Sequence, residues 1–91
     1  MKHFYRNVPN LGNVAVSRHA QERIREARIS EPSFERILIG GLDTPIGTNV
    51  VWREKDGLRL VILVNPTPNI GAKLVKTVYR VKAPAQVVTG R

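Results

Sequence analysis

The chain has 91 residues and carries 15 Lys and Arg against 7 Asp and Glu, which gives a formal net charge of +8. This length predicts one domain, residues 1–91. The chain has no Cys, which excludes disulfides and thiolate metal sites, and it has no apolar run as long as a membrane span. No signal peptide is visible. We therefore expect a cytoplasmic site of action. This expectation also covers a chain that is delivered into target cells as part of a larger secreted protein.

The positive charge is concentrated in the second half of the chain. Residues 46–91 carry eight Lys or Arg and two Asp or Glu, whereas residues 1–45 carry seven and five. A chain this basic attracts polyanions, a class that includes nucleic acids, acidic proteins and anionic membranes. A membrane is the least favoured of these partners, because no expected helix pairs a broad apolar face with a purely basic one. We expect no membrane partner.

Two helices are predicted over residues 17–40, after an arm or loops at residues 1–13 and a short apolar segment at residues 14–16. Ser17 and Ser30 are suitable N-caps for the two helices, because a serine side chain accepts a hydrogen bond from the first turn. The first helix has a narrow apolar stripe, and the second has a wider core face that ends at two glycines. The stripe contains Ala20, Ile24 and Ala27, and the core face contains Phe34, Ile37 and Leu38.

The rest of the chain reads as an antiparallel sheet over residues 48–82. A turn-rich link at residues 42–47 precedes a strand at 49–54, and Asp56-Gly57 is a strong hairpin signal. The apolar run at residues 58–64 predicts a central strand covered on both faces. A loop, a strand at residues 72–81 and a tail at 83–91 follow. The sequence therefore predicts an α+β domain in which two N-terminal helices pack on a three- to four-stranded antiparallel sheet.

The first helix carries a candidate catalytic stripe. His19 and Arg23 share one face of that helix, with Glu26 about one turn further on. This stripe borders the apolar one, so its side chains are expected at the rim of the helix–sheet interface. A histidine can exchange protons near neutral pH, which suits acid–base catalysis. The alternative is that His19 is a polar boundary residue and that Arg23 and Glu26 form an ordinary surface ion pair.

The last strand adds hydroxyl groups and positive charges. Strict alternation places Thr77 and Tyr79 on one face with Lys73, and Lys76 and Arg80 on the other. The alternative is that Thr and Tyr simply favour strands and that basic residues protect a sheet edge. The candidate nucleic-acid-binding residues are Arg18, Arg53, Lys73, Lys76 and Arg80.

Other kinds of site have weaker support. Trp52 could stack on a base, but the only Trp of a small domain is more often a core residue. His3 and His19 lie far apart in sequence with no nearby acidic cluster, so we expect no metal site. No glycine-rich phosphate loop precedes a helix, and we expect no cofactor.

The order of these elements resembles a known group of domains. The segment SRHAQERIREARISEPSFERIL, followed by a hairpin and the strand KLVKTVY, is similar to small domains that open with a Ser-x-His-Ala-x-x-Arg helix and finish with a Thr-Val-Tyr strand. Those domains belong to the barnase, EndoU, colicin and RelE-like ribonuclease fold. The resemblance covers roughly residues 14–81. Many members of that group are toxins of toxin–antitoxin pairs or of contact-dependent inhibition systems, and many cleave tRNA or mRNA.

The resemblance implies a catalytic site made of His19, Arg23, Thr77 and Tyr79. Ala27-Arg28 departs from the group, in which many members have Arg-Gly before the Ile-Ser turn. The first hypothesis is therefore a metal-independent endoribonuclease toxin that cleaves RNA, such as tRNA or mRNA, through attack by the 2′-OH. Its expected partner besides RNA is an acidic antitoxin or immunity protein. The second hypothesis is a non-catalytic basic module that binds nucleic acid or an acidic protein.

Overall fold

The computed structural model describes residues 2–81, which form two helices and one six-stranded sheet. The sheet order is β1-β2-β6-β5-β4-β3. Neighbouring strands are antiparallel except β2 and β6, which are parallel, so the sheet is mixed. In chain order the elements are β1 (Phe4–Val8), β2 (Gly12–Val16), α1 (Arg18–Glu26), α2 (Glu31–Gly40), β3 (Leu42–Ile46), β4 (Val50–Lys55), β5 (Leu58–Leu63) and β6 (Lys73–Arg80).

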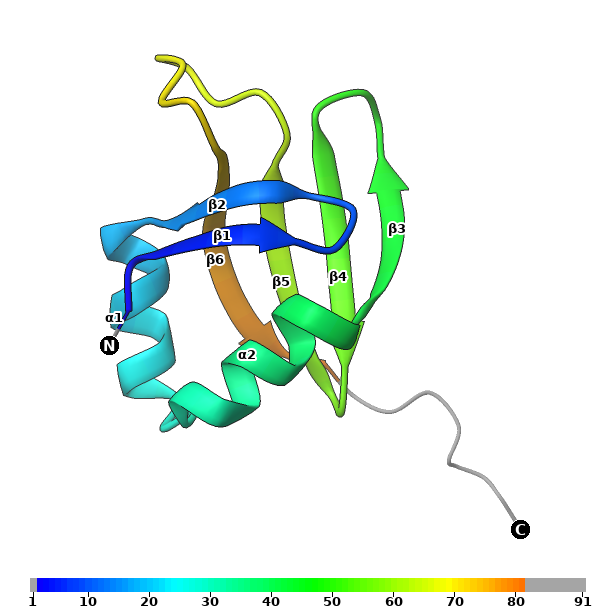
Figure 1. Ribbon diagram of the computed structural model, residues 1–91. Helices are drawn as coiled ribbons and strands as arrows, with labels where there is room; N and C mark the ends of the chain where they lie inside the picture. The colour runs from blue at the N-terminus through cyan, green and yellow to red at the C-terminus, as the bar shows by residue number, and fades with distance from the viewer. Residues whose placement is uncertain (1, 82–91) are drawn as a thin grey trace, which may run out of the picture.

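The additional elements cover one face of the sheet. The β1–β2 hairpin crosses in front of β6, β5 and β4, and α2 lies across the lower part of the same side (Figure 1). Helix α1 runs beside β6, with which it packs. The buried core lies between these elements and the sheet, and Leu60, Ile62, Val75 and Val78 come from the sheet side. Within residues 2–81, no helix or strand covers the opposite face of β4–β6.

Several local predictions are confirmed. The Ser17 and Ser30 side chains accept hydrogen bonds from the backbone N–H groups of Ala20 and Ser33, so both cap their helices as expected. Phe34, Ile37 and Leu38 are completely buried and form the core face of α2. Asp56 and Gly57 have φ angles of 54° and 78° and connect β4 to β5 as a hairpin.

The predicted arrangement of two N-terminal helices on a three- to four-stranded antiparallel sheet is wrong. Strands precede the helices, and the sheet has six strands and one parallel pairing. Residues 1–13, expected as an arm or loops, contain β1 and the start of β2. Tyr5 and Val8 are buried there, and Asn10 and Gly12 adopt φ angles of 65° and 74° around the hairpin turn. Pro9 and Asn10, which indicated a loop, form the hairpin turn, whereas Asn7 lies in the edge strand β1 and Asn13 lies in β2.

Two further expectations about the sheet are corrected. The link expected at residues 42–47 contains β3, which pairs with β4 along its whole length. β3 is an exposed edge strand, where Pro45 is tolerated because one side of the strand needs no ladder hydrogen bond. β5, expected to be covered on both faces, alternates instead between buried and half-buried residues. Its apolar run therefore belongs to a strand that is buried on one face only.

A β-bulge in β6 changes which residues share a face. Val61 on β5 pairs with Thr77, but Ile62 pairs with Val75, so Lys76 is an extra residue without a partner. Val75 and Val78 consequently both reach the core, although strict alternation places them on opposite faces. Thr77 and Tyr79 remain on a common face because both follow the bulge.

Candidate functional site on the open face of the sheet

The uncovered face of the sheet carries a cluster of polar and aromatic side chains. Glu54 pairs with Arg59, and Arg59 pairs with Tyr79, so these three residues stand in one row across β4, β5 and β6. Trp52 and Thr77 stand in the next row, on either side of Val61. All five polar or aromatic residues are half-buried. We term this surface the open face and define it by Trp52, Glu54, Arg59, Thr77 and Tyr79.

Arg59 is at the centre of the open face. Its guanidinium carbon lies 3.8 Å from the centroid of the Trp52 ring and 5.4 Å from that of Tyr79, which are cation–π distances. Its Nη1 donates a hydrogen bond of 2.9 Å to the Tyr79 hydroxyl, and its Nε pairs with the Glu54 carboxylate. The hydrogen bond with Tyr79 is the main reason that the pKa of Arg59 is raised. The Arg59 side chain is 20% exposed and that of Glu54 is 34% exposed, so this surface presents a fixed guanidinium that is paired with a carboxylate.

Helix α1 borders the open face through its capping residue. The Ser17 hydroxyl donates a hydrogen bond of 3.0 Å to the carbonyl of Lys76, which is the bulge residue of β6. The backbone N–H of Ser17 also donates to the Val75 carbonyl. The first turn of α1 is therefore attached to β6 immediately before Thr77.

His19 and Arg23 lie on the flank of α1 that turns away from the β1–β2 hairpin. Gln21 and Arg25 line a hollow together with His3, just before β1, so their flank of α1 faces the covered side. Since successive helical residues are about 100° apart, His19 and Arg23 project on roughly the opposite flank. Both are exposed. This flank is therefore the one that points away from His3.

Of the four predicted catalytic residues, the structure places Thr77 and Tyr79 on one face of β6 and His19 and Arg23 on one flank of α1. Among residues 2–81, no hydrogen bond connects His19 to Thr77 or Tyr79. Arg23 forms a 3.3 Å ion pair with Glu26, and both side chains are largely exposed, as the alternative interpretation of this stripe expected. The chemical capacity of the site is therefore an exposed histidine on α1 beside a strand that presents two hydroxyls and a fixed guanidinium.

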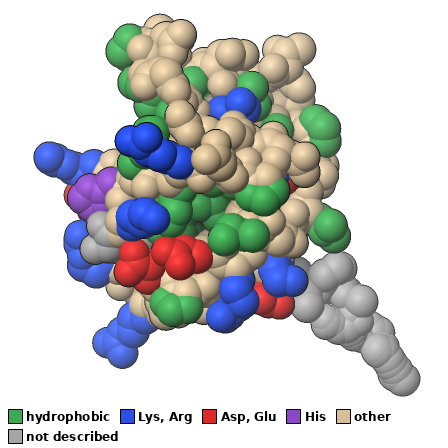
Figure 2. All heavy atoms as spheres, viewed as in Figure 1, with side chains coloured by type: hydrophobic (Ala, Val, Ile, Leu, Met, Phe, Trp, Pro, Cys, Tyr) green, Lys and Arg blue, Asp and Glu red, His purple; other side chains and the backbone are tan. Residues whose placement is uncertain are grey.

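The candidate nucleic-acid-binding residues are dispersed. Arg18 and Lys76 are exposed next to the Ser17 hydrogen bond. Arg80 is exposed and donates a hydrogen bond of 2.9 Å to the Ala27 carbonyl just after α1, so it helps to hold that helix. Lys73 is half-buried in a hollow on the covered side. On that side, Lys and Arg side chains are interspersed with acidic and hydrophobic ones (Figure 2).

Arg53 does not belong to a nucleic-acid-binding surface, which corrects the prediction. It is only 2% exposed, and its Nε and Nη2 donate to the two Asp43 carboxylate oxygens at 2.6 and 2.8 Å. The guanidinium also donates to the carbonyls of Leu38 and Pro9. Arg53 therefore connects β4 to β3, to α2 and to the β1–β2 turn, and all its hydrogen bonds are internal.

Three members of the open face were not predicted as site residues from the sequence: Trp52, Glu54 and Arg59. Trp52 was expected in the core, but it is half-buried and its ring is covered by Arg59. A signal was available, because a two-residue turn at Asp56-Gly57 places Glu54 directly opposite Arg59. The contact between Arg59 and Tyr79 could not be predicted in this way, because it depends on how β6 pairs with β5.

The described residues contain neither a metal-binding cluster nor a membrane-spanning helix. In the part of the chain that the structure describes, no three His, Asp or Glu side chains are grouped so that they could hold a metal ion. None of the described helices is long and apolar enough to cross a membrane.

Comparisons with known proteins identify no relative. No protein-family model, no curated protein and no solved structure matches the chain.

Proposed function

We propose that the chain is an endoribonuclease whose RNA substrate lies along the open face and whose cleavage chemistry needs no metal. The observation that carries the proposal is the hydrogen bond from Ser17 to the Lys76 carbonyl. It holds the start of α1, with His19 and Arg23, beside the strand that carries Thr77 and Tyr79. A helix that carries an acid–base group, packed against a strand with two hydroxyls, suits attack on a phosphodiester in a basic protein.

His19 acts in this proposal as the general base. It takes the proton of a ribose 2′-OH, and the oxygen attacks the adjacent phosphorus, which forms a 2′,3′-cyclic phosphate and releases the 5′-oxygen. Arg59 stabilises the negative charge that develops on the phosphoryl oxygens, and Arg23 and Lys76 contribute further positive charge. The Tyr79 oxygen already accepts a hydrogen bond from Arg59, so its own O–H is left to donate to the phosphate or to the leaving oxygen. Thr77 helps to position the phosphate.

The test is cleavage of total RNA and purified tRNA by the wild-type protein in EDTA. We expect fragments with 2′,3′-cyclic phosphate ends and no cleavage of DNA of the same sequence, because DNA lacks the attacking hydroxyl. His19→Ala should lower the rate by roughly a hundredfold or more. His3→Ala is the matched control. His3 is exposed and lies next to Gln21 and Arg25, on the flank of α1 opposite His19. Intact RNA at high wild-type concentration, or equal cleavage by His19→Ala, contradicts the proposal.

A non-catalytic RNA-binding module is the second candidate. It is favoured by the exposed cations Arg18 and Lys76, which can contact phosphates without any acid–base chemistry. In that case His19→Ala leaves RNA affinity within about twofold, and no cleavage accompanies binding. Replacing exposed Arg18 and Lys76 by Met should then lower the slope of log Kobs against log salt by about 1.4, or 0.7 per lost phosphate contact. An unchanged slope excludes both cations from the RNA interface.

The ribonuclease proposal also implies a neutralising partner. We propose an acidic antitoxin or immunity protein that covers the open face. A chain with a net charge of +8 attracts an acidic surface, and a protein bound there would exclude RNA from the open face. The product of a neighbouring gene, purified with this chain, should suppress cleavage, and the complex should dissociate more readily at high salt. A neighbour that binds without suppressing cleavage contradicts this assignment.

A further inference from the structure

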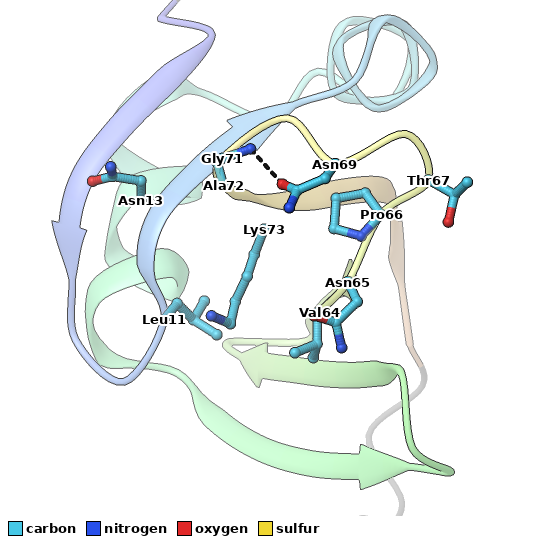
Figure 3. A pocket seen from close by; sticks show the side chains of 10 residues that line it. All are labelled: Leu11, Asn13, Val64, Asn65, Pro66, Thr67, Asn69, Gly71, Ala72 and Lys73. Carbon is cyan, nitrogen blue, oxygen red and sulfur yellow. Dashed lines mark hydrogen bonds between the residues drawn. The ribbon is translucent and has the colours of Figure 1, made fainter.

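A second site is suggested by a hollow on the covered side of the sheet. The hollow has a volume of about 420 Å³ and lies between the β1–β2 hairpin and the loop that joins β5 to β6 (Figure 3). Leu11 lines it from the hairpin, and Val64, Asn65 and Asn69 line it from the loop. The volume falls in the range of small-molecule pockets. Because the hairpin covers the face opposite Arg59 and Tyr79, this hollow is separate from the open face.

Lys73 places a positive charge inside the hollow. Its side chain extends from the start of β6 into the space between Leu11 and Val64 (Figure 3), and the residue is half-buried. None of the residues that line the hollow is acidic. Among residues 2–81, no carboxylate forms an ion pair with Lys73. A bound anion could form a charge-assisted hydrogen bond with this ammonium.

The loop supplies neutral hydrogen-bonding groups next to Lys73. The Asn69 side-chain oxygen accepts a 2.8 Å hydrogen bond from the Gly71 N–H, which turns its NH₂ group toward the hollow (Figure 3). The loop begins at a fixed point, because the Asn65 N–H donates to the Asn49 side chain at 2.6 Å and the Asn65 carbonyl accepts from it at 3.3 Å. An ammonium and a side-chain amide donor are groups that bind an oxyanion.

The remaining lining limits the kind of ligand. No aromatic side chain lines the hollow, so a nucleobase has no surface to stack on. The absence of lining carboxylates disfavours a cation. Leu11, Val64 and Pro66 provide apolar contact for a short organic group attached to the oxyanion.

We propose that this hollow binds a phosphate oxyanion, with Lys73 as its cationic anchor and the Asn69 amide as a second donor. Inorganic phosphate and the phosphate of a mononucleotide are two sources of this one chemical group. The inference does not rest on the ribonuclease proposal, because the open face contributes no residue to the hollow.

The experiment is titration of the ¹⁵N-labelled full chain with sodium phosphate at pH 7, with ionic strength held constant by sodium chloride. We expect saturable shifts of the Asn69, Gly71 and Lys73 amide signals. Lys73→Met, which keeps the apolar stem, should weaken binding at least tenfold, whereas Lys55→Met should not, because Lys55 is exposed at the β4–β5 hairpin. Absence of saturable shifts at the loop, or equal affinity in Lys73→Met, overturns the proposal.

A second variant tests the loop without removing the lysine. Asn69→Asp keeps an oxygen that accepts from Gly71 but adds a negative charge, so phosphate affinity should fall at least tenfold. Unchanged affinity in Asn69→Asp contradicts the assignment of Asn69. A parallel titration with uridine 5′-monophosphate distinguishes the sources: tighter binding than phosphate indicates that the apolar wall contacts the organic group, and equal binding indicates recognition of the oxyanion alone.

Discussion

The Ser17 hydroxyl joins Lys76 to Ala20, because it donates to the Lys76 carbonyl and accepts from the Ala20 N–H, both at 3.0 Å. One side chain thus caps α1 and attaches it to the bulge of β6. The cap is a local feature of the helix, whereas the attachment joins residues 59 positions apart. The two roles can be separated by comparison with Ser30, which caps α2 and whose hydroxyl, among residues 2–81, bonds only to Ser33.

Ser17→Ala and Ser30→Ala should each lower the free energy of unfolding by about 1 kcal/mol, because each removes one helix cap. If the proposed ribonuclease activity holds, only Ser17→Ala should also reduce RNA cleavage, by roughly tenfold, since it alone removes a hydrogen bond that positions the first turn of α1 on β6. Urea unfolding and cleavage rates measured on the same preparations check this. Equal cleavage by the two variants would mean that the position of α1 does not matter for activity.

Arg53→Met should lower the free energy of unfolding by about 3 kcal/mol, because it leaves Asp43 and the carbonyls of Leu38 and Pro9 without their donor. Arg36→Met is the matched control. Arg36 is exposed and, within residues 2–81, its side chain bonds only to the Ser33 hydroxyl, so a change within about 0.5 kcal/mol is expected. Both values come from urea unfolding at pH 7. A loss below 1 kcal/mol for Arg53→Met would show that water replaces the buried guanidinium at little cost.

The two adjacent glycines at the C-terminal end of α2, Gly40 and Gly41, should respond in opposite directions to substitution by Ala. A Cβ on Gly41 would lie 2.6 Å from both the Arg53 Cγ and the Ile37 carbonyl oxygen, so Gly41→Ala should destabilise the protein by about 2 kcal/mol. A Cβ on Gly40 meets nothing within 4 Å, and Gly40→Ala should stabilise the helix end by about 0.5 kcal/mol. Thermal unfolding of both variants provides the comparison, and melting temperatures that move together would contradict the close approach at Gly41.

Tyr5 should make stability depend on pH in the alkaline range. Burial, followed by the Glu35 and Glu31 charges, raises the pKa of its hydroxyl above the ordinary 10.0. The folded state then holds this proton more tightly than the unfolded state, so the contribution is complete below pH 10 and is lost as pH rises above 10. Relative to Tyr5→Phe, the wild type should lose about 1.4 kcal/mol per pH unit there. Urea unfolding from pH 8 to 11 measures this, and parallel profiles for the two proteins would contradict it.

Only some of the spatial relationships in the candidate site could be predicted from the sequence. Thr77 and Tyr79 share a face because they are two residues apart, and His19 and Arg23 share a flank because they are four apart. Strict alternation failed at Lys76, because the bulge shifts the register against β5. Arg53 was expected to contact nucleic acid, since nothing near it in sequence shows that Asp43 and two backbone carbonyls take up its hydrogen bonds.

The sequence by itself determined the elements whose stabilising contacts are local. Both helices are capped by a hydroxyl three residues from the amide that it satisfies, and the Asp56-Gly57 turn needs only its own backbone angles. Tertiary structure decided the rest. β1 and β3 are strands because partners supply their hydrogen bonds, and the open face exists because the β1–β2 hairpin and α2 cover only the other side. Pairing between distant segments depends on register and burial, and neither of these is determined by neighbouring residues along the chain.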